Sequence, residues 1–103
     1  MREKSFLLFN YFENNIVTRD KMKEFFKEIE REKADKISVD FKNIDFISRS
    51  CSDEYIKLKS KSKKMFEEVN VNNSVKMMLE HVYKSLVRSV YESSSKKLNL
   101  VAP

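Results

Sequence analysis

Apolar residues recur along this chain with two different periods, which predict strands and helices in alternation. Residues 5–12, "SFLLFNYF", are short, aromatic and nearly all apolar, and predict a strand buried on both faces or nearly so. A helix is predicted from Thr18, a suitable N-cap residue. Its apolar positions have the spacing of one helix face and are Met22, Phe25, Phe26 and Ile29. The first third of the chain therefore predicts a strand followed by an amphipathic helix.

The middle of the chain repeats this order. Residues 37–41 alternate between apolar and polar and predict a second strand, after which Asn43 turns the chain. Ser50 is expected to be the N-cap of a second helix, with Asp53 as its partner in an approximate capping box. One face of this helix is expected to carry Cys51, Tyr55, Leu58, Met65 and Phe66. Another face is expected to carry Lys57, Lys61 and Lys64. Reversing the charges of these three lysines is then expected to leave the fold intact.

A third strand is predicted around residues 69–71, and a third helix from Ser74 as its N-cap. The apolar positions of this helix are Val75, Met78, Leu79, Val82, Leu86 and Val90. Residues 96–103 are either an edge strand or a loose tail. This order predicts an α/β fold: a small sandwich whose three- to four-stranded sheet is mostly parallel or mixed, with helices mainly on one face. A single domain is expected over residues 1–103, with its core at about 5–90 and a C-terminal tail at 91–103.

Composition agrees with one small domain. The 103 residues are 41% hydrophobic and include 8 Phe and 4 Tyr, enough for one modest core. The chain has no glycine, so left-handed backbone positions are expected to fall mostly to asparagine. Asparagines do stand between the predicted elements, at Asn14 and Asn15, Asn43, and Asn72 and Asn73.

Cysteine content and hydropathy indicate a cytoplasmic location. The single cysteine, Cys51, cannot form an internal disulfide. A small buried residue is favoured there over a reactive thiol. No apolar run approaches the ~20 residues that span a bilayer. The N-terminal "MREKSFLLFNYF" starts basic and turns apolar, but Asn10 interrupts it and no small-residue cleavage site follows. No membrane contact is predicted.

The segment "VDFKNIDFISRSCSDEY", residues 39–55, joins the second predicted strand to the second predicted helix. It resembles the central motif of STAS-like domains, specifically the small prokaryotic family of STAS-like domains of unknown function. That motif is a strand ending in "DF", a short turn and then "IS-S-ADE". The matching residues are Asp40, Phe41, Ile47, Ser48, Ser50, Asp53 and Glu54.

Two flanking segments are similar to the same family. "IVTRDKMKEF" resembles the "L-SR--A" opening of the family's first helix, with Val17, Arg19 and Met22 at the corresponding positions. "VNVNNSVKMML" is similar to the last strand and Asn-rich turn before its final helix. The resemblance therefore covers roughly residues 5–90 and implies a STAS-like fold.

The resemblance also implies a regulatory, non-enzymatic role. In the wider superfamily, anti-sigma-factor antagonists carry "DSSG" at this junction, and a partner kinase phosphorylates the second serine. Here Ser48, Arg49, Ser50 and Cys51 stand at these four positions, so Ser50 alone is retained. Ser50 is thus either a plain helix cap or also a phosphoacceptor that controls partner binding. The implied partner is an ATPase/kinase-like or anti-sigma-type protein.

Charged residues near the junction have a structural interpretation as well. Arg19, Asp53 and Glu54 are expected to tie the starts of two helices together, because an arginine fork pairs with carboxylates. The alternative is unconnected surface charge. Asp40 ends a strand, where open α/β sheets place ligands, but a hydrogen-bonding role is favoured over ligand contact.

The formal net charge of +5 supports an alternative function, a small basic nucleic-acid-binding regulator. Its contact face would be Lys57, Lys61 and Lys64 within "KLKSKSKK", which is otherwise a solvated helix face or a contact for an acidic protein. That run has no interleaved aromatic residues to stack on bases. The chain's one histidine, His81, has no neighbouring cysteine or histidine, so no catalytic residue, metal site or cofactor is predicted. The partner's identity and the oligomeric state stay open.

Overall fold

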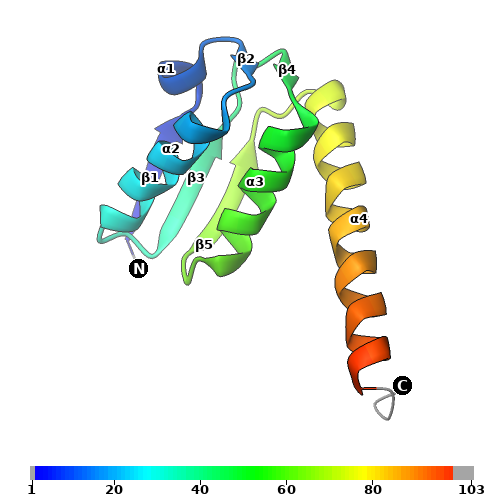
Figure 1. Cartoon of the computed structure of the whole chain (residues 1–103). Helices are drawn as coiled ribbons and strands as arrows, with labels where there is room; N and C mark the ends of the chain where they lie inside the picture. The colour runs from blue at the N-terminus through cyan, green and yellow to red at the C-terminus, as the bar shows by residue number, and fades with distance from the viewer. Residues whose placement is uncertain (1, 99–103) are drawn as a thin grey trace.

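Strands and helices alternate along the chain (Figure 1), in a computed structural model that describes the backbone of residues 2–98 and the side chains of residues 2–88. In chain order the elements are β1 (Glu3–Leu7), α1 (Phe9–Phe12), β2 (Asn15–Ile16), α2 (Arg19–Arg31), β3 (Lys36–Asp40), β4 (Phe46–Ile47), α3 (Arg49–Lys61), β5 (Met65–Val69) and α4 (Asn73–Leu98). The predicted α/β class is confirmed.

Three strands form one parallel sheet in the order β1–β3–β5. Glu3 lies opposite Lys36, and Lys36 lies opposite Met65. Both crossovers step in the same direction across the sheet, so right-handed connections place α2 and α3 on the same face (Figure 1). The expected mostly parallel sheet is confirmed.

A separate two-stranded ribbon joins the segments that lead into α2 and α3. β2 pairs in parallel with β4, with Asn15 opposite Phe46 and Ile16 opposite Ile47. The backbone N–H of Ser48 extends the pairing by donating to the carbonyl of Ile16 at 2.9 Å. Because each of these short strands runs almost directly into a helix, their pairing brings the starts of α2 and α3 close together.

The core lies between the three-stranded sheet and the helices. All four residues of the predicted α2 stripe are buried. Phe25 is fully buried, and its ring makes edge-to-face contacts with Phe6, Tyr11 and Phe26. The helical phase predicted for α2 is therefore confirmed, and Thr18 is its N-cap, although its side chain makes no capping hydrogen bond.

Residues 5–12 are not a single strand. β1 ends at Leu7, and Phe9–Phe12 form one helical turn. This turn lets both Leu8 and Phe12 point into the core, where they are 0% and 7% exposed. A continuous strand would have alternated its side chains between two faces, so the nearly unbroken apolar run reflects this change of backbone conformation.

The third strand was predicted too late in the chain. β5 covers Met65–Val69, so Met65 and Phe66 belong to this strand and not to the preceding helix. α3 ends at Lys61, where the N–H of Ser62 bonds the carbonyl of Lys59. Phe66 lies opposite Ile37 in the sheet, and this pairing determines the position of the strand.

α4 begins two residues earlier than predicted and ends later. Asn72, not Ser74, caps it: the side-chain oxygen of Asn72 accepts from the N–H of Val75 at 2.8 Å. The helix continues to Leu98, so residues 91–98 of the expected C-terminal tail are helical, and residues 96–98 do not form the edge strand considered for them. The remainder of that expectation, residues 99–103, lies outside the described residues. In Figure 1 the later part of α4 extends away from the sheet.

Asparagine takes two of the three left-handed positions in the described backbone. Asn43 has a φ of 65° and Asn70 a φ of 57°, while the third position is Glu13 at 57°. The expected use of asparagine is therefore confirmed at Asn43 and Asn70, although Asn70 is not one of the asparagines named from the sequence, and Glu13 takes the position before Asn14.

Lys64 does not lie on an exposed helix face. It follows α3, is half-buried, and its Nζ donates to the carbonyls of Glu32 and Ala34 at 2.7 and 2.6 Å. These carbonyls follow the C-terminal end of α2, where a cation is favoured by the helix dipole. The prediction that all three lysines share one helix face is wrong for Lys64, so the reason for expecting charge reversal to be tolerated does not apply to this residue. Lys57 and Lys61 are exposed on α3 as expected.

Candidate functional site

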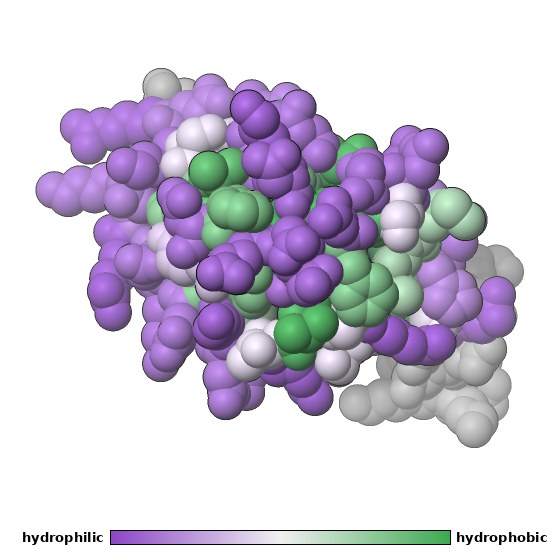
Figure 2. Space-filling view, turned by 90° about the horizontal axis from the view of Figure 1, so that it is seen from above, coloured by the Kyte–Doolittle hydropathy of each residue, from purple (hydrophilic) through white to green (hydrophobic). Residues whose placement is uncertain are grey.

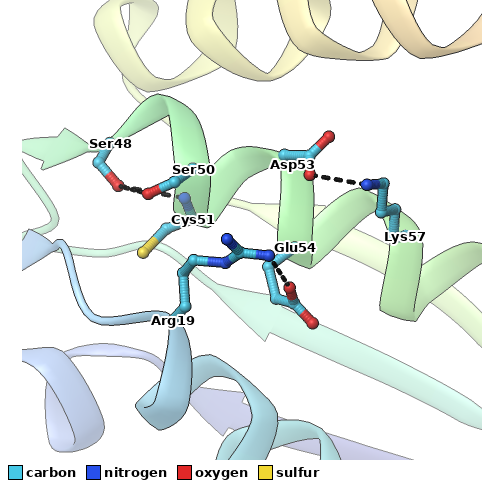
Figure 3. Close-up of polar contacts among 7 residues, drawn as sticks. All are labelled: Arg19, Ser48, Ser50, Cys51, Asp53, Glu54 and Lys57. Atoms are coloured by element: carbon cyan, nitrogen blue, oxygen red, sulfur yellow. Dashed lines mark hydrogen bonds and ion pairs between the residues drawn. The ribbon is translucent and has the colours of Figure 1, made fainter.

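The junction between β4 and α3 is built around Ser48. Ser48 is the N-cap of α3, and its Oγ accepts from the N–H of Cys51 at 3.1 Å (Figure 3). The prediction that Ser50 caps this helix is therefore wrong by two residues. The β2–β4 pairing holds Ile47 in the core and the Ser48 N–H on Ile16, so the chain can turn into the helix directly after Ser48.

Removing the two hydroxyls separately should distinguish their roles. Ser48→Ala should lower the free energy of unfolding by about 1 kcal/mol, because the helix loses its capping acceptor. Ser50→Ala should change it by less than about 0.5 kcal/mol, since Ser50 is exposed and inside the first turn. Urea unfolding of both variants measures the difference. Equal losses would contradict the assignment of the cap.

Ser50 lies on the exposed first turn of α3, beside α4. Its Oγ is 3.3 Å from that of Ser48 (Figure 3). Ser50 also borders a groove of about 550 Å³ between the two helices. Arg49 and Asp53 from α3, and Val82, Ser85 and Leu86 from α4, form the rest of its lining. A group added to Ser50 would therefore meet solvent on one side and α4 on the other.

The predicted tie between the starts of α2 and α3 is present between Arg19 and Glu54, whereas Asp53, also expected in it, pairs with Lys57. The Arg19 guanidinium donates to Glu54 Oε1 at 2.9 Å, and Glu54 is only 8% exposed (Figure 3). This hydrogen bond raises the pKa of Arg19 above its ordinary value, so the arginine stays charged. The arginine compensates the negative charge of the buried Glu54 carboxylate, and the contact holds the starts of the two helices at a fixed spacing.

Asp53 and Asp40 make contacts of their own. Asp53 forms an ion pair with Lys57 at 3.0 Å, one turn along α3, instead of closing a capping box (Figure 3). The Oδ1 of Asp40 accepts from the N–H of Lys42 and from the side-chain amide of Asn70, both at 2.9 Å. The expected hydrogen-bonding role of Asp40 is confirmed: it joins the end of β3 to the residue after β5.

Cys51 and Ser52 face the interior from the first turn of α3. Cys51 is a free cysteine and 0% exposed, as expected for a small buried residue. Ser52 is also 0% exposed, and its Oγ has no hydrogen-bond partner among the described residues. Solvent therefore reaches this turn through Arg49 and Ser50 rather than through the thiol.

A second polar cluster lies where α3 meets the edge strand β5. The buried Tyr55 hydroxyl donates to Glu68 Oε2 at 2.6 Å, and Lys59 Nζ lies 2.7 Å from the same oxygen. Burial, and then the Glu68 carboxylate, raise the pKa of Tyr55 well above its ordinary value. The cluster fixes α3 to the sheet and was not predicted, because Glu68 could be assigned to a strand only once the sheet was known.

Two exposed apolar residues adjoin the junction and were also missed by the sequence analysis. Val17 is 55% exposed and Phe46 is 44% exposed. Ile16 and Ile47 face the core. Val17 follows Ile16 and Phe46 precedes Ile47, so in extended backbone both of these side chains point outward. Figure 2 looks down on this end of the molecule and shows hydrophobic surface among hydrophilic side chains. The sequence signal is a pair of adjacent apolar residues at each short strand, Ile16 with Val17 just after β2 and Phe46 with Ile47 in β4, of which one is buried.

Every helix within residues 2–98 is too short or too polar to cross a bilayer. Among the described side chains, those of residues 2–88, no group of three or more histidine, cysteine, aspartate or glutamate residues could hold a metal ion. His81 is exposed on α4.

No family model, curated protein or solved structure matches this chain. The resemblance of the central motif to STAS-like domains stays a hypothesis, and the α/β fold and the junction geometry stand independently of it.

Proposed function

We propose that this chain is a STAS-like, non-enzymatic interaction module, and that the β4–α3 junction binds a regulatory protein. The observation that carries this proposal is the pairing of an exposed hydroxyl, Ser50, with exposed apolar side chains at Val17 and Phe46 on one rigid end of the molecule. By resemblance, the partner is an ATPase/kinase-like or anti-sigma-type protein.

The composition of this surface supports protein contact. Val17 and Phe46 lie on the outer side of the β2–β4 ribbon, and the exposed arginines Arg19 and Arg49 begin the helices that follow its two strands. Protein interfaces commonly have such an apolar centre with a polar rim, in which arginine is enriched. The Ser48 cap and the Arg19–Glu54 pair keep this end ordered before binding, which lowers the entropic cost of association.

The surroundings of Ser50 support a role for phosphorylation as a switch. A phosphoryl group would add about −1.5 to −2 charges at the N-terminal end of α3, where the helix dipole stabilises anions. On the other side it would face Asp53 and the apolar Val82 and Leu86 of α4. Modification would thus add charge to the junction that carries the proposed contact surface, and a partner that binds the unmodified form should be released.

The test uses the full chain as bait in native lysate. Phosphoserine at position 50 should lower recovery of the partner at least tenfold, which is about 1.4 kcal/mol. Phosphoserine at Ser60, an exposed position near the far end of α3, is the matched control and should leave recovery unchanged. Phe46→Ser should also lower recovery, because it removes the apolar contact. Equal recovery from all these baits would refute the proposal.

The nucleic-acid alternative stays a prediction, with a changed contact surface. Lys64 is engaged with the end of α2, and Lys57 is paired with Asp53, so the three lysines do not form one free face. Of these three lysines, Lys61 alone lies beside other cationic side chains in the lining of one groove, and those side chains belong to α2.

A further inference from the structure

A second surface lies away from the Ser50 junction, in the groove between α2 and α3. The two helices lie side by side on the sheet (Figure 1), and the groove between their outer surfaces has a volume of about 550 Å³. Its floor is apolar, formed by Phe26 and Leu58. Four cations line it as well: Lys23, Lys27, Arg31 and Lys61.

The charge of this groove is not needed to stabilise the fold. Lys23, Lys27 and Arg31 stand at i, i+4 and i+8 on α2, where like charges on neighbouring turns destabilise a helix by about 0.2–0.5 kcal/mol per pair. Within residues 2–88, no carboxylate lies close enough to any of the four cations to form an ion pair. The one acid in the lining, Glu30, accepts a 2.6 Å hydrogen bond from Ser62 Oγ.

The groove is held open by polar contacts at both ends. Arg19 and Glu54 join the helices at their starts, and the Glu30–Ser62 hydrogen bond links the end of α2 to the residue after α3. The spacing of the helices is therefore set before any ligand arrives. A preformed site of this kind loses less conformational entropy on binding than a mobile one.

The floor favours a peptide over a nucleic acid. Phe26 is only 3% exposed and packs edge-to-face on Phe25 and Tyr55, so its ring is not available to stack on a base. Leu58 and the aliphatic stems of the lysines offer a surface for an apolar side chain. From Lys23 to Arg31 the row of cations is about 12 Å long at the 1.5 Å rise of a helix, which matches two turns of a bound helix.

We propose that the α2–α3 groove binds an acidic, amphipathic segment of a partner protein. The carboxylates of that segment pair with the row of Lys23, Lys27 and Arg31, and with Lys61 across the groove. An apolar side chain between them covers Phe26 and Leu58. This surface is separate from Ser50, so the binding of an acidic segment does not depend on the junction.

A synthetic probe tests the groove directly. The probe is a labelled helical peptide of about 15 residues with glutamates at i, i+4 and i+8 and leucines on the neighbouring ridge. Fluorescence anisotropy with the full chain should detect binding that Lys27→Glu/Lys61→Glu weakens at least tenfold. The matched control, Lys4→Glu/Lys84→Glu, makes the same change in net charge at exposed positions outside the groove and should weaken binding less than threefold.

Probe variants and competitors decide the chemistry of the ligand. Replacing the glutamates by glutamine, or the leucines by serine, should each lower affinity at least fivefold if carboxylates and an apolar side chain are both required. Equal losses in the two double variants of the protein would overturn the proposal, since net charge alone would explain them. Tighter binding of an oligothymidylate or of phosphatidylserine vesicles, lost with Lys27→Glu/Lys61→Glu, would assign the groove to nucleic acid or lipid instead. Neither result alters the Ser50 experiment, whose variants lie outside the groove.

Discussion

Lys64→Met should lower the free energy of unfolding by about 2 kcal/mol and the melting temperature by about 10 °C. The ammonium group of Lys64 donates to two carbonyls at the end of α2, and hydrogen bonds from charged donors contribute more than neutral ones. Methionine retains the apolar stem but has no donor. Lys64→Glu should cost about 3 kcal/mol, because a carboxylate would face the same carbonyl oxygens.

The neighbouring lysines are the control for this effect. Lys57→Met and Lys61→Met remove the same charge from exposed positions and should change stability by less than about 0.5 kcal/mol. Urea unfolding at neutral pH measures all of them on one scale. If Lys64→Met unfolds at the same midpoint as Lys61→Met, the contact with α2 contributes nothing to stability.

Alkaline pH should destabilise the protein through Tyr55. Burial raises the folded-state pKa of Tyr55 well above 10, whereas the unfolded chain titrates near the ordinary value. The stability contributed by this protonated hydroxyl is complete below pH 10. Above pH 10 the unfolded state releases the proton first, so stability falls by up to about 1.4 kcal/mol per pH unit.

Comparison with Tyr55→Phe isolates this titration from that of the lysines. At pH 9 the variant should be less stable by about 1 kcal/mol, because the hydrogen bond to Glu68 is lost. The difference should shrink as pH rises and change sign near pH 11. Tyr83→Phe, which removes an exposed hydroxyl from α4, should show no such reversal. A constant difference between wild type and Tyr55→Phe from pH 9 to 11.5 would show that Tyr55 does not titrate differently in the two states.

The helical phase of α2 and the parallel β/α order could be predicted because both follow from hydrophobic spacing. The buried residues of α2 were identified individually, and the helix start at Thr18 was correct. The Arg19–Glu54 contact was also predicted, because an arginine fork pairs with carboxylates, although Asp53 was expected to take part in it.

The predictions that were wrong concern residues for which the local sequence allows two conformations or contacts equally well, and tertiary contacts determine which one forms. Ser48 and Ser50 are both suitable caps, and the pairing of Ile47 with Ile16 decided for Ser48. Lys64 is indistinguishable in sequence from the lysines around it, and its position beside the end of α2 depends on how the loop before β5 folds. The α2–α3 groove likewise combines side chains from two helices that are distant in the sequence, so no single segment of the sequence indicated it.

The parallel order β1–β3–β5 also has a consequence for the way this chain acquires its structure. No neighbouring pair of strands in this sheet is joined by a hairpin, and every pairing connects residues about thirty positions apart. Sheet formation must therefore wait for a long loop to close, which slows folding relative to a protein of mostly local contacts. During synthesis, β3 has only β1 to pair with until Met65–Val69 leave the ribosome. Until then the second edge of β3 is unpaired, and this interval is when the nascent chain is most exposed to aggregation.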